Sequence, residues 1–256
     1  MIVVLYDLNE AVIEYAEKLI HKNLDFLINK DKISSAEKTL ILDRLLFTTN
    51  ADECVADIII EAIIEKLEAK EALFTKLALI NSPQTILASN TSSLSINAIQ
   101  QNVPSPERVL GMHFFNPANI MKLVEVVKGN LTSEAVAEQV MDLCLKMKKT
   151  PVLCNDAPGF IVNRMARHYY LEGMKLVENK IATIENVDAA MEASGFKMGP
   201  FKLMDLIGMD INYAVSESIY AAFENAERFK PSAIQKDKVE KGELGKKSGR
   251  GFYNYN

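Results

Sequence analysis

His113 is the side chain in this sequence that is best suited to proton transfer. It ends an apolar run, residues 109–113, that predicts a buried β-strand. An imidazole titrates near neutral pH, so it can take a proton from a hydroxyl group or return one to an alkoxide. The end of a strand is also where α/β sheets place their ligands. The other two histidines, His21 and His168, lie in predicted helices, and we expect surface or packing roles for them.

Glu125 lies in the next predicted strand, where Leu123 and Glu125 alternate with Val124 and Val126. These apolar flanks disfavour a solvated surface glutamate. A carboxylate bonded to one imidazole nitrogen fixes the tautomer of the ring and stabilises the imidazolium, so Glu125 is a candidate partner for His113. The alternative is a structural glutamate in an ion pair.

Short apolar runs alternate with helical patterns over the first two-thirds of the chain, and this predicts an α/β fold. Such alternation is typical of a mostly parallel sheet with helices on both faces. The predicted strands cover residues 2–6, 57–61, 86–89, 109–113, 122–127 and 150–154. The predicted helices cover residues 10–29, 66–80 and 133–148, with a further helix after residue 30 that is capped by Ser34 or Ser35 and carries Glu37 in its first turn.

After Asp156 the pattern changes to helices alone, at residues 160–177, 184–193, 211–223 and 232–241. The turn-forming residues 156–159 mark the boundary. We therefore predict two domains, an α/β domain at residues 1–155 and an all-helical domain at residues 156–256.

The composition argues against several classes of protein. A net charge of −5 without a basic stripe disfavours nucleic-acid binding. Three cysteines, Cys54, Cys144 and Cys154, form no CxxC pair, which favours a reducing compartment. No stretch approaches the ~20 apolar residues of a membrane span, and the first residues lack the features of a signal peptide. We expect a cytoplasmic protein with a small-molecule ligand and without a nucleic-acid partner, a membrane partner or a bound metal.

Asp7 ends the first predicted strand, and a long helix follows it. A strand-end acid of this kind is half of a dinucleotide signature, because it accepts hydrogen bonds from the adenosine ribose and repels the 2′-phosphate of NADP. The other half, G-x-G-x-x-G, lies about 20 residues upstream in such proteins, whereas the glycines of this sequence begin at Gly111. A strand-end or helix-capping aspartate is an equally good interpretation of Asp7.

Four segments in fixed order carry a resemblance to a known family: SNTSSL at residues 89–94, GMHFFNP at 111–117, MKLVEVV at 121–127 and DAPGFIVNR at 156–164. Further matches are VADIIIEAIIE at 55–65, MGPF at 198–201, DLIG at 205–208 and GKKSGRGFY at 245–253. The sequence resembles the 3-hydroxyacyl-CoA dehydrogenases over its whole length, and most of all their short bacterial 3-hydroxybutyryl-CoA members. The resemblance implies a Rossmann-type N-terminal domain, a helical C-terminal domain that dimerises, and hydride exchange between NAD(H) and the 3-position of an acyl-CoA.

The resemblance also assigns catalytic roles. His113 becomes the general acid and base for the 3-hydroxyl group, and Glu125 the carboxylate that orients it. Ser92 and Asn163 match polar contacts to the substrate, and Ser92 also suits a contact to the nicotinamide. A helix or turn cap remains the alternative for Ser92.

Five further residues match ligand-binding positions of the family. Asn116 matches a nicotinamide contact, and Glu65, Lys70 and Lys247 match NAD-contacting positions. Lys30 matches a position that touches the phosphates of CoA, where a lysine acts as a point charge. Without the resemblance, Glu65, Lys70 and Lys247 would be interpreted as solvated surface charges, and Lys30 as a lysine that complements the helix dipole.

The first strand and glycine-rich loop of the family have no counterpart in these 256 residues. That strand is central in the order 3-2-1-4-5-6, so we expect unpaired strands on both sides of its place. Two hypotheses follow. The chain belongs to an active NAD-dependent (S)-3-hydroxybutyryl-CoA dehydrogenase, or it is a truncated, non-catalytic dimer that binds CoA and binds NAD poorly.

Overall fold

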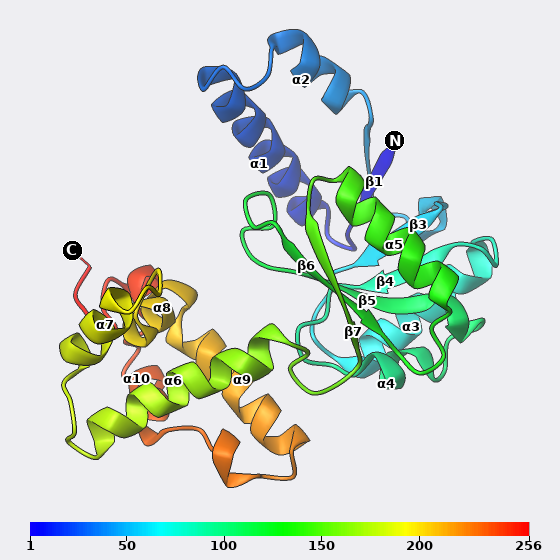
Figure 1. The fold of residues 1–256 in the computed structure, drawn as a ribbon. Coiled ribbons are helices and arrows are strands. Elements are labelled where there is room, and N and C mark those ends of the chain that lie inside the picture. Colours follow the sequence, from blue (N-terminus) through cyan, green and yellow to red (C-terminus); the bar gives the residue numbers. More distant parts are fainter. Residues whose placement is uncertain (256) are drawn as a thin grey trace.

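The computed structural model describes residues 1–255, and Figure 1 shows that an α/β part is followed along the chain by a helical part. Five strands form the main sheet in the order β3 (Ile58–Glu61), β4 (Ile86–Ser89), β5 (Val109–Phe114), β6 (Leu123–Lys128) and β7 (Thr150–Asn155). All neighbouring strands run parallel except β5 and β6, which are antiparallel. The predicted mostly parallel Rossmann-type sheet is therefore confirmed.

A second, two-stranded sheet precedes the main one in sequence. It pairs β1 (Val3–Tyr6) with β2 (Leu45–Thr48) in parallel, and its strands are not hydrogen-bonded to β3. This separation agrees with the unpaired strands that we expected. The strand β2 was not predicted, because only two residues separate it from the end of α2 and its apolar residues continue the apolar pattern of that helix.

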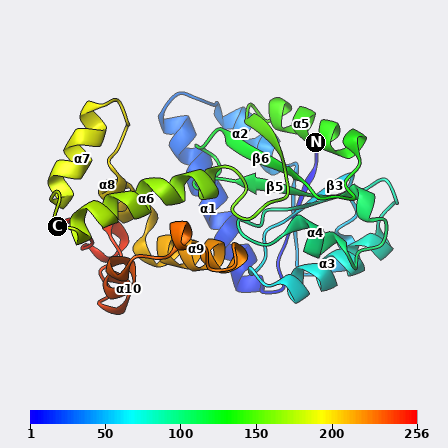
Figure 2. The same cartoon turned by 60° about the horizontal axis from the view of Figure 1, so that its bottom comes forward.

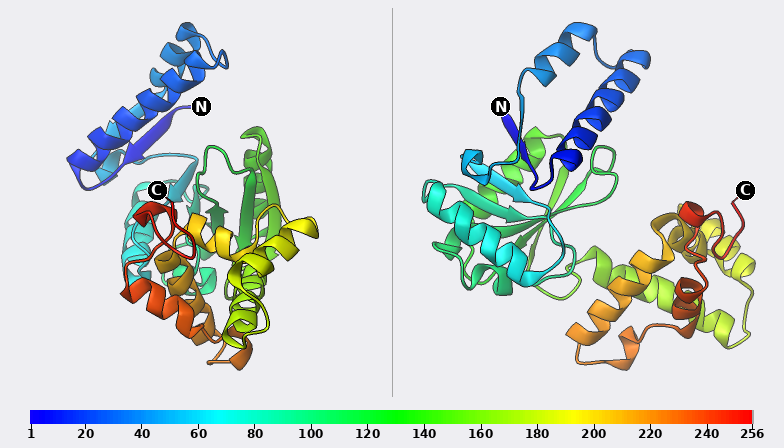
Figure 3. Two further views of the ribbon diagram at one scale, coloured as in Figure 1. Left: turned by 90° about the vertical axis from the view of Figure 1, so that its left-hand side faces the viewer. Right: turned by 180° about the vertical axis from the view of Figure 1, so that it is seen from behind.

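Two helices connect β1 to β2 and project from the α/β part as an arm (Figure 3). They are α1 (Glu10–Asn29) and α2 (Ser35–Leu42). The Ser34 hydroxyl accepts a hydrogen bond from the Glu37 N–H, and the Glu37 carboxylate accepts one from the Ser34 N–H. This capping box fixes the start of α2 as predicted.

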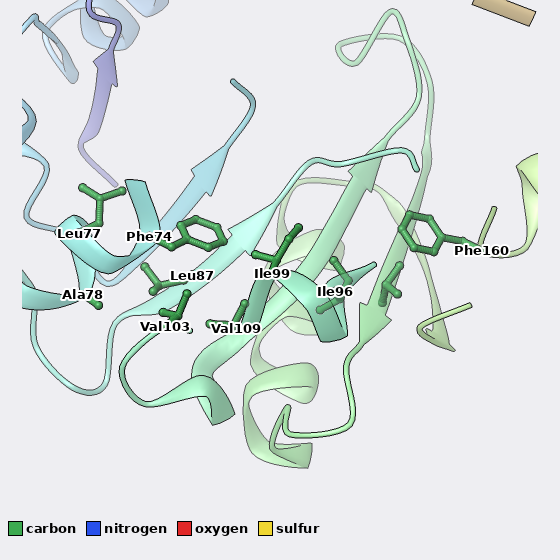
Figure 4. Packing of buried hydrophobic residues seen from close by; sticks show 10 residues of the cluster. Phe74, Leu77, Ala78, Leu87, Ile96, Ile99, Val103, Val109 and Phe160 are labelled. Atoms are coloured by element: carbon green, nitrogen blue, oxygen red, sulfur yellow. The ribbon is translucent and has the colours of Figure 1, made fainter. Parts of the chain in front are cut away.

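Helices cover both faces of the main sheet. The helices α3 (Leu67–Ile80) and α4 (Ile96–Gln100) pack on one face, where Phe74 and Ile99 meet Leu87 and Val109 in a buried cluster (Figure 4). The helix α5 (Glu134–Lys146) covers the other face, where a second cluster comprises Ile86, Ala88, Leu110, Met112, Val124, Val126, Val140 and Cys144. Successive strand residues thus point to opposite cores, which explains the unbroken apolar runs.

Within residues 156–255, the part after β7 contains five α-helices: α6 (Val162–Glu178), α7 (Ile184–Ala193), α8 (Pro200–Ile207), α9 (Met209–Ala222) and α10 (Ala233–Glu240). Figure 2 shows α6 extending from the sheet into this helical part. The helix α8 was not predicted. It ends at Gly208, whose φ of +103° allows α9 to begin directly afterwards.

The final segment of the chain packs against two buried carboxylates. Asp205 is 0% exposed and accepts hydrogen bonds from the backbone N–H groups of Phe252 and Tyr253 and from the Tyr255 hydroxyl. Asp188 accepts a hydrogen bond from the Tyr253 hydroxyl. These bonds tie the glycine-rich end of the chain to α7 and α8. Within residues 1–255, no helix is long and apolar enough to cross a membrane.

Candidate active site

The antiparallel pairing of β5 and β6 places His113 directly opposite Glu125. The His113 Nδ1 atom lies 2.7 Å from the Glu125 Oε2 atom, and the two residues are 5% and 1% exposed. Because an ionised carboxylate only accepts hydrogen bonds, this contact places a proton on Nδ1. The Nε2 atom is then the one that can exchange a proton with a substrate. The imidazole packs against the rings of Phe115 and Phe160, with distances of 4.6 and 5.8 Å between the ring centroids.

The second oxygen of Glu125 bonds to the start of the helical part. Oε1 accepts hydrogen bonds from the backbone N–H groups of Ile161, at 3.0 Å, and Val162, at 2.8 Å. These N–H groups open α6 and have no partner within the helix. One buried carboxylate therefore fixes both the orientation of the imidazole and the position of α6 relative to the sheet.

Ser92 and Asn163 meet at the same place. Ser92 lies in the loop after β4, here called the Ser92 loop (residues 90–93), and its carbonyl oxygen accepts a hydrogen bond of 3.3 Å from the Asn163 Nδ2 atom. Asn163 lies in the first turn of α6. The Asn90 Oδ1 atom accepts a hydrogen bond from the Phe114 N–H, which ties the loop to the strand that carries His113. The structure thus brings together the four predicted catalytic residues from two strands, a loop and a helix.

Glu65 anchors the Ser92 loop. Its Oε1 atom accepts hydrogen bonds from the backbone N–H groups of Ser92 and Ser93, at 3.0 and 3.1 Å, and from the hydroxyl groups of Thr91 and Ser93. Burial raises the pKa of the Glu65 carboxyl, but these hydrogen bonds and the Lys70 charge outweigh burial, so the pKa lies below its ordinary value.

Lys70 is 1% exposed, so its interpretation as a solvated surface charge is wrong. Its Nζ atom lies 2.6 Å from the Glu61 Oε1 atom and 3.3 Å from the Glu65 Oε2 atom. Sequence reasoning missed Glu61. The available signal was an acid that ends the apolar run of β3, the strand that pairs with β4.

The remaining predicted ligand-binding residues lie outside this network in the part of the chain that the structure describes. Lys30 is the C-cap residue of α1, in the arm that α1 and α2 form. Asn116 is exposed in the loop after β5. Lys247 forms an ion pair with Asp210 at the start of α9, within the helical part. For these three residues, a contact to NAD or CoA stays a prediction.

The residues at the strand ends fit a nicotinamide cofactor. Asp7 is half-buried at the carboxyl end of β1, and its carboxylate accepts a hydrogen bond from the Asn9 N–H. It therefore has the place and the chemistry of an acceptor for ribose hydroxyls. The N-cap of α1 is Asn9, whose side chain accepts a hydrogen bond from the Ala11 N–H, so Asp7 is a strand-end residue and not the helix cap. The carboxyl ends of β3 and β4 lead into the loops that carry Glu65 and Ser92.

Comparison with known proteins gives consistent matches over both parts of the chain. The model of the 3-hydroxyacyl-CoA dehydrogenase NAD binding domain matches residues 1–157, and that of the C-terminal domain of the same family matches residues 159–255. A 3-hydroxyadipyl-CoA dehydrogenase of Escherichia coli K12 is 46% identical over 99% of this chain, and the chain spans 54% of that protein. A probable 3-hydroxybutyryl-CoA dehydrogenase of Bacillus subtilis is 40% identical, with coverage of 98% and 88%.

Solved structures give the same result. A 3-hydroxybutyryl-CoA dehydrogenase from Escherichia coli K12 superimposes with a TM-score of 0.96 at 46% identity, over 99% of this chain and 54% of the other. An (S)-3-hydroxybutyryl-CoA dehydrogenase from Ralstonia eutropha gives a TM-score of 0.95 at 33% identity, over 100% of this chain and 91% of the other. The chain therefore belongs to the 3-hydroxyacyl-CoA dehydrogenase family of NAD-dependent oxidoreductases.

Proposed function

We propose that the protein interconverts (S)-3-hydroxyacyl-CoA and 3-oxoacyl-CoA with NAD(H), and that 3-hydroxybutyryl-CoA and acetoacetyl-CoA are its substrate pair. The observation that carries this proposal is the buried His113–Glu125 pair, at 2.7 Å, beside the contact between Ser92 and Asn163. A proton-transfer residue with a fixed tautomer is what the oxidation of a secondary alcohol requires.

The chain's own residues handle the proton and hold the substrate. In the oxidation, His113 takes the proton of the 3-hydroxyl group on Nε2, and Glu125 holds the resulting imidazolium through Nδ1. In the reduction, His113 returns that proton to the new alkoxide. The Ser92 hydroxyl and the Asn163 amide contact the oxygens of the substrate. NAD, when bound, supplies a hydride acceptor, and NADH supplies the donor.

In this proposal, NAD is contacted by six residues: Asp7, Glu65, Lys70, Ser92, Asn116 and Lys247. The phosphates of CoA are contacted by Lys30. Asp7 would accept hydrogen bonds from the adenosine ribose and disfavour NADP. Glu65 has one carboxylate oxygen committed to the Ser92 loop, so its contribution includes the shape of that loop.

We also propose a homodimer that associates through the helical part, residues 156–256, which we treat as a domain separate from residues 1–155. The junction of α8 and α9 exposes Leu206, Ile207 and Ile211, with exposed fractions of 50%, 37% and 51%. Apolar side chains clustered at one junction are typical of a surface that a partner covers. The three free cysteines support a reducing compartment such as the cytoplasm.

A spectrophotometric assay of the full-length protein tests the reaction and its substrate. It would follow the oxidation of NADH, with NADPH as the matched control, on acetoacetyl-CoA and on 3-oxoadipyl-CoA. The second substrate is included because one relative, at 46% identity, is a 3-hydroxyadipyl-CoA dehydrogenase. We expect the higher kcat/KM on acetoacetyl-CoA with NADH. A higher value on 3-oxoadipyl-CoA would refute the substrate assignment, and the absence of turnover on both would refute the function.

A further inference from the structure

Glu61 and Lys70 form a buried ion pair next to the Ser92 loop. Their side chains are 0% and 1% exposed, and the Lys70 Nζ atom lies 2.6 Å from the Glu61 Oε1 atom. Removing two charges from water costs several kcal/mol per ion, and apolar residues of the same size often give equal or greater stability. Stability alone is therefore a weak reason for this pair, and its connections point to a positional role.

Glu61 holds two segments through its two oxygens. Oε1 also accepts a 2.6 Å hydrogen bond from the Ile63 N–H, in the connection between β3 and α3. Oε2 accepts one of 2.6 Å from the hydroxyl group of Ser89, the last residue of β4. The Ser89 hydroxyl in turn accepts a hydrogen bond from the Thr91 N–H. This first path runs from Glu61 directly into the Ser92 loop.

A second path runs through Lys70. Its ammonium group lies between the two carboxylates, 2.6 Å from Glu61 and 3.3 Å from Glu65. Glu65 accepts hydrogen bonds from the N–H groups of Ser92 and Ser93. The position of Lys70 depends on Glu61, because Glu61 is its fully buried partner. Both paths therefore start at Glu61 and end on the residues that flank and include Ser92.

We propose that Glu61 is a positioning residue for the reaction, which holds the Ser92 loop in place through Ser89 and through Lys70 and Glu65. The proposal rests on the proposed function, in which Ser92 contacts the substrate. Glu61 acts indirectly in this proposal, because its two carboxylate oxygens hold the Lys70 ammonium group, the Ile63 N–H and the Ser89 hydroxyl group. Its effect is on the geometry of a contact, and an error of ~1 Å there can cost ~10²-fold in rate.

The test compares Glu61→Gln and Ser89→Ala with the parent in the full-length protein. Glutamine keeps the shape of Glu61, but it removes the charge and replaces one acceptor oxygen by an NH2 donor. Ser89→Ala removes the hydroxyl group of the first path and leaves the ion pair intact. The control is Glu68→Gln, which neutralises an exposed acid in the first turn of α3. We expect kcat on acetoacetyl-CoA to fall roughly 10- to 100-fold in Glu61→Gln, with a KM within about threefold of the parent.

Amide hydrogen exchange gives a second readout that does not depend on turnover. The N–H groups of residues 91–93 should exchange faster in Glu61→Gln than in the parent, whereas those of α5 should not change. A folded Glu61→Gln protein with unchanged exchange at residues 91–93 overturns the proposal. If Glu61→Gln does not fold, the same criterion applies to Ser89→Ala. Faster exchange together with an inactive parent would support the positional role and contradict the proposed function alone.

Discussion

Replacement of Glu125 by glutamine tests how the His113 tautomer is fixed. The amide has the same shape, and its oxygen can still accept from the N–H groups of Ile161 and Val162, at 3.0 and 2.8 Å. Its NH2 group must then face the His113 Nδ1 atom at the position where Oε2 lies 2.7 Å away. Two donors cannot share a hydrogen bond, so Nδ1 must give up its proton and the neutral ring carries it on Nε2. Such a ring cannot take the proton of the substrate.

In Glu125→Gln, His113 would be in the wrong tautomer and could not act as a general base. Replacing the carboxylate of a carboxylate–histidine pair by an amide costs up to ~10⁴ in kcat, and loss of general acid–base catalysis costs ~10²–10⁴. We therefore expect kcat for the oxidation of 3-hydroxybutyryl-CoA to fall by ~10²–10⁴, which is a barrier increase of ~3–5 kcal/mol. The reduction of acetoacetyl-CoA should also fall, because the imidazolium that donates the proton loses its buried counter-charge.

The assay is steady-state turnover in both directions, with circular dichroism to confirm that the variant is folded. The control is Glu138→Gln, which neutralises an exposed acid on α5. If folded Glu125→Gln protein turned over within threefold of the parent, the assignment of Nε2 as the reactive atom would be wrong.

Three further changes act on stability. Gly111→Ala should lower the free energy of unfolding by about 1–3 kcal/mol in a denaturant titration, because a Cβ atom there would lie 2.9 Å from both Ile96 and Val127. An unchanged midpoint would contradict the close packing of Gly111 against these two side chains. Asp205→Ala leaves three hydrogen-bond donors without their acceptor and should cost ~2–4 kcal/mol, whereas a cost below ~0.5 kcal/mol would contradict the role of this carboxylate in holding the end of the chain. The pKa of Glu65 is lower in the folded protein, so its ionised carboxylate stabilises the fold above the unfolded pKa of about 4.3, and this stability is lost as pH falls through the folded pKa. The difference in free energy of unfolding between the parent and Glu65→Gln, measured in urea, should therefore shrink between about pH 6 and pH 3. A difference that stays constant over this range would refute the prediction.

The sequence was most informative where a local pattern, such as an apolar run or a helix cap, determines the secondary structure. The buried strands β4 and β5 have apolar residues on both faces, and the capping box of Ser34 and Glu37 marks the start of α2, so both were predictable. The strand β3 was found from the same kind of apolar run, but it lies at the edge of the sheet and Ile60 is exposed. His113 and Glu125 were found through their motifs and their strand context. Their hydrogen bond was not derivable from spacing alone, because it depends on the antiparallel pairing of β5 with β6 in an otherwise parallel sheet.

The parts that were missed depend on tertiary contacts. Lys70 has the sequence context of a surface helix residue, and only the position of Glu61 on the neighbouring strand explains its burial. The helix α8 is short and begins with Pro200 directly after a glycine, so its pattern resembles a loop. Its place is set by the Asp188 carboxylate, which accepts hydrogen bonds from the N–H groups of Phe201 and Lys202.

The most direct test of the proposed chemistry is the turnover of His113→Ala on acetoacetyl-CoA and NADH. The matched control is His168→Ala, since His168 is exposed and its ring packs at a tilt against that of Phe229 in the helical part. We predict that His113→Ala loses ~10²–10⁴ in kcat while it still binds NADH and unfolds cooperatively, and that His168→Ala keeps the turnover of the parent. Activity of His113→Ala within threefold of the parent would contradict the assignment of His113 as the general acid and base.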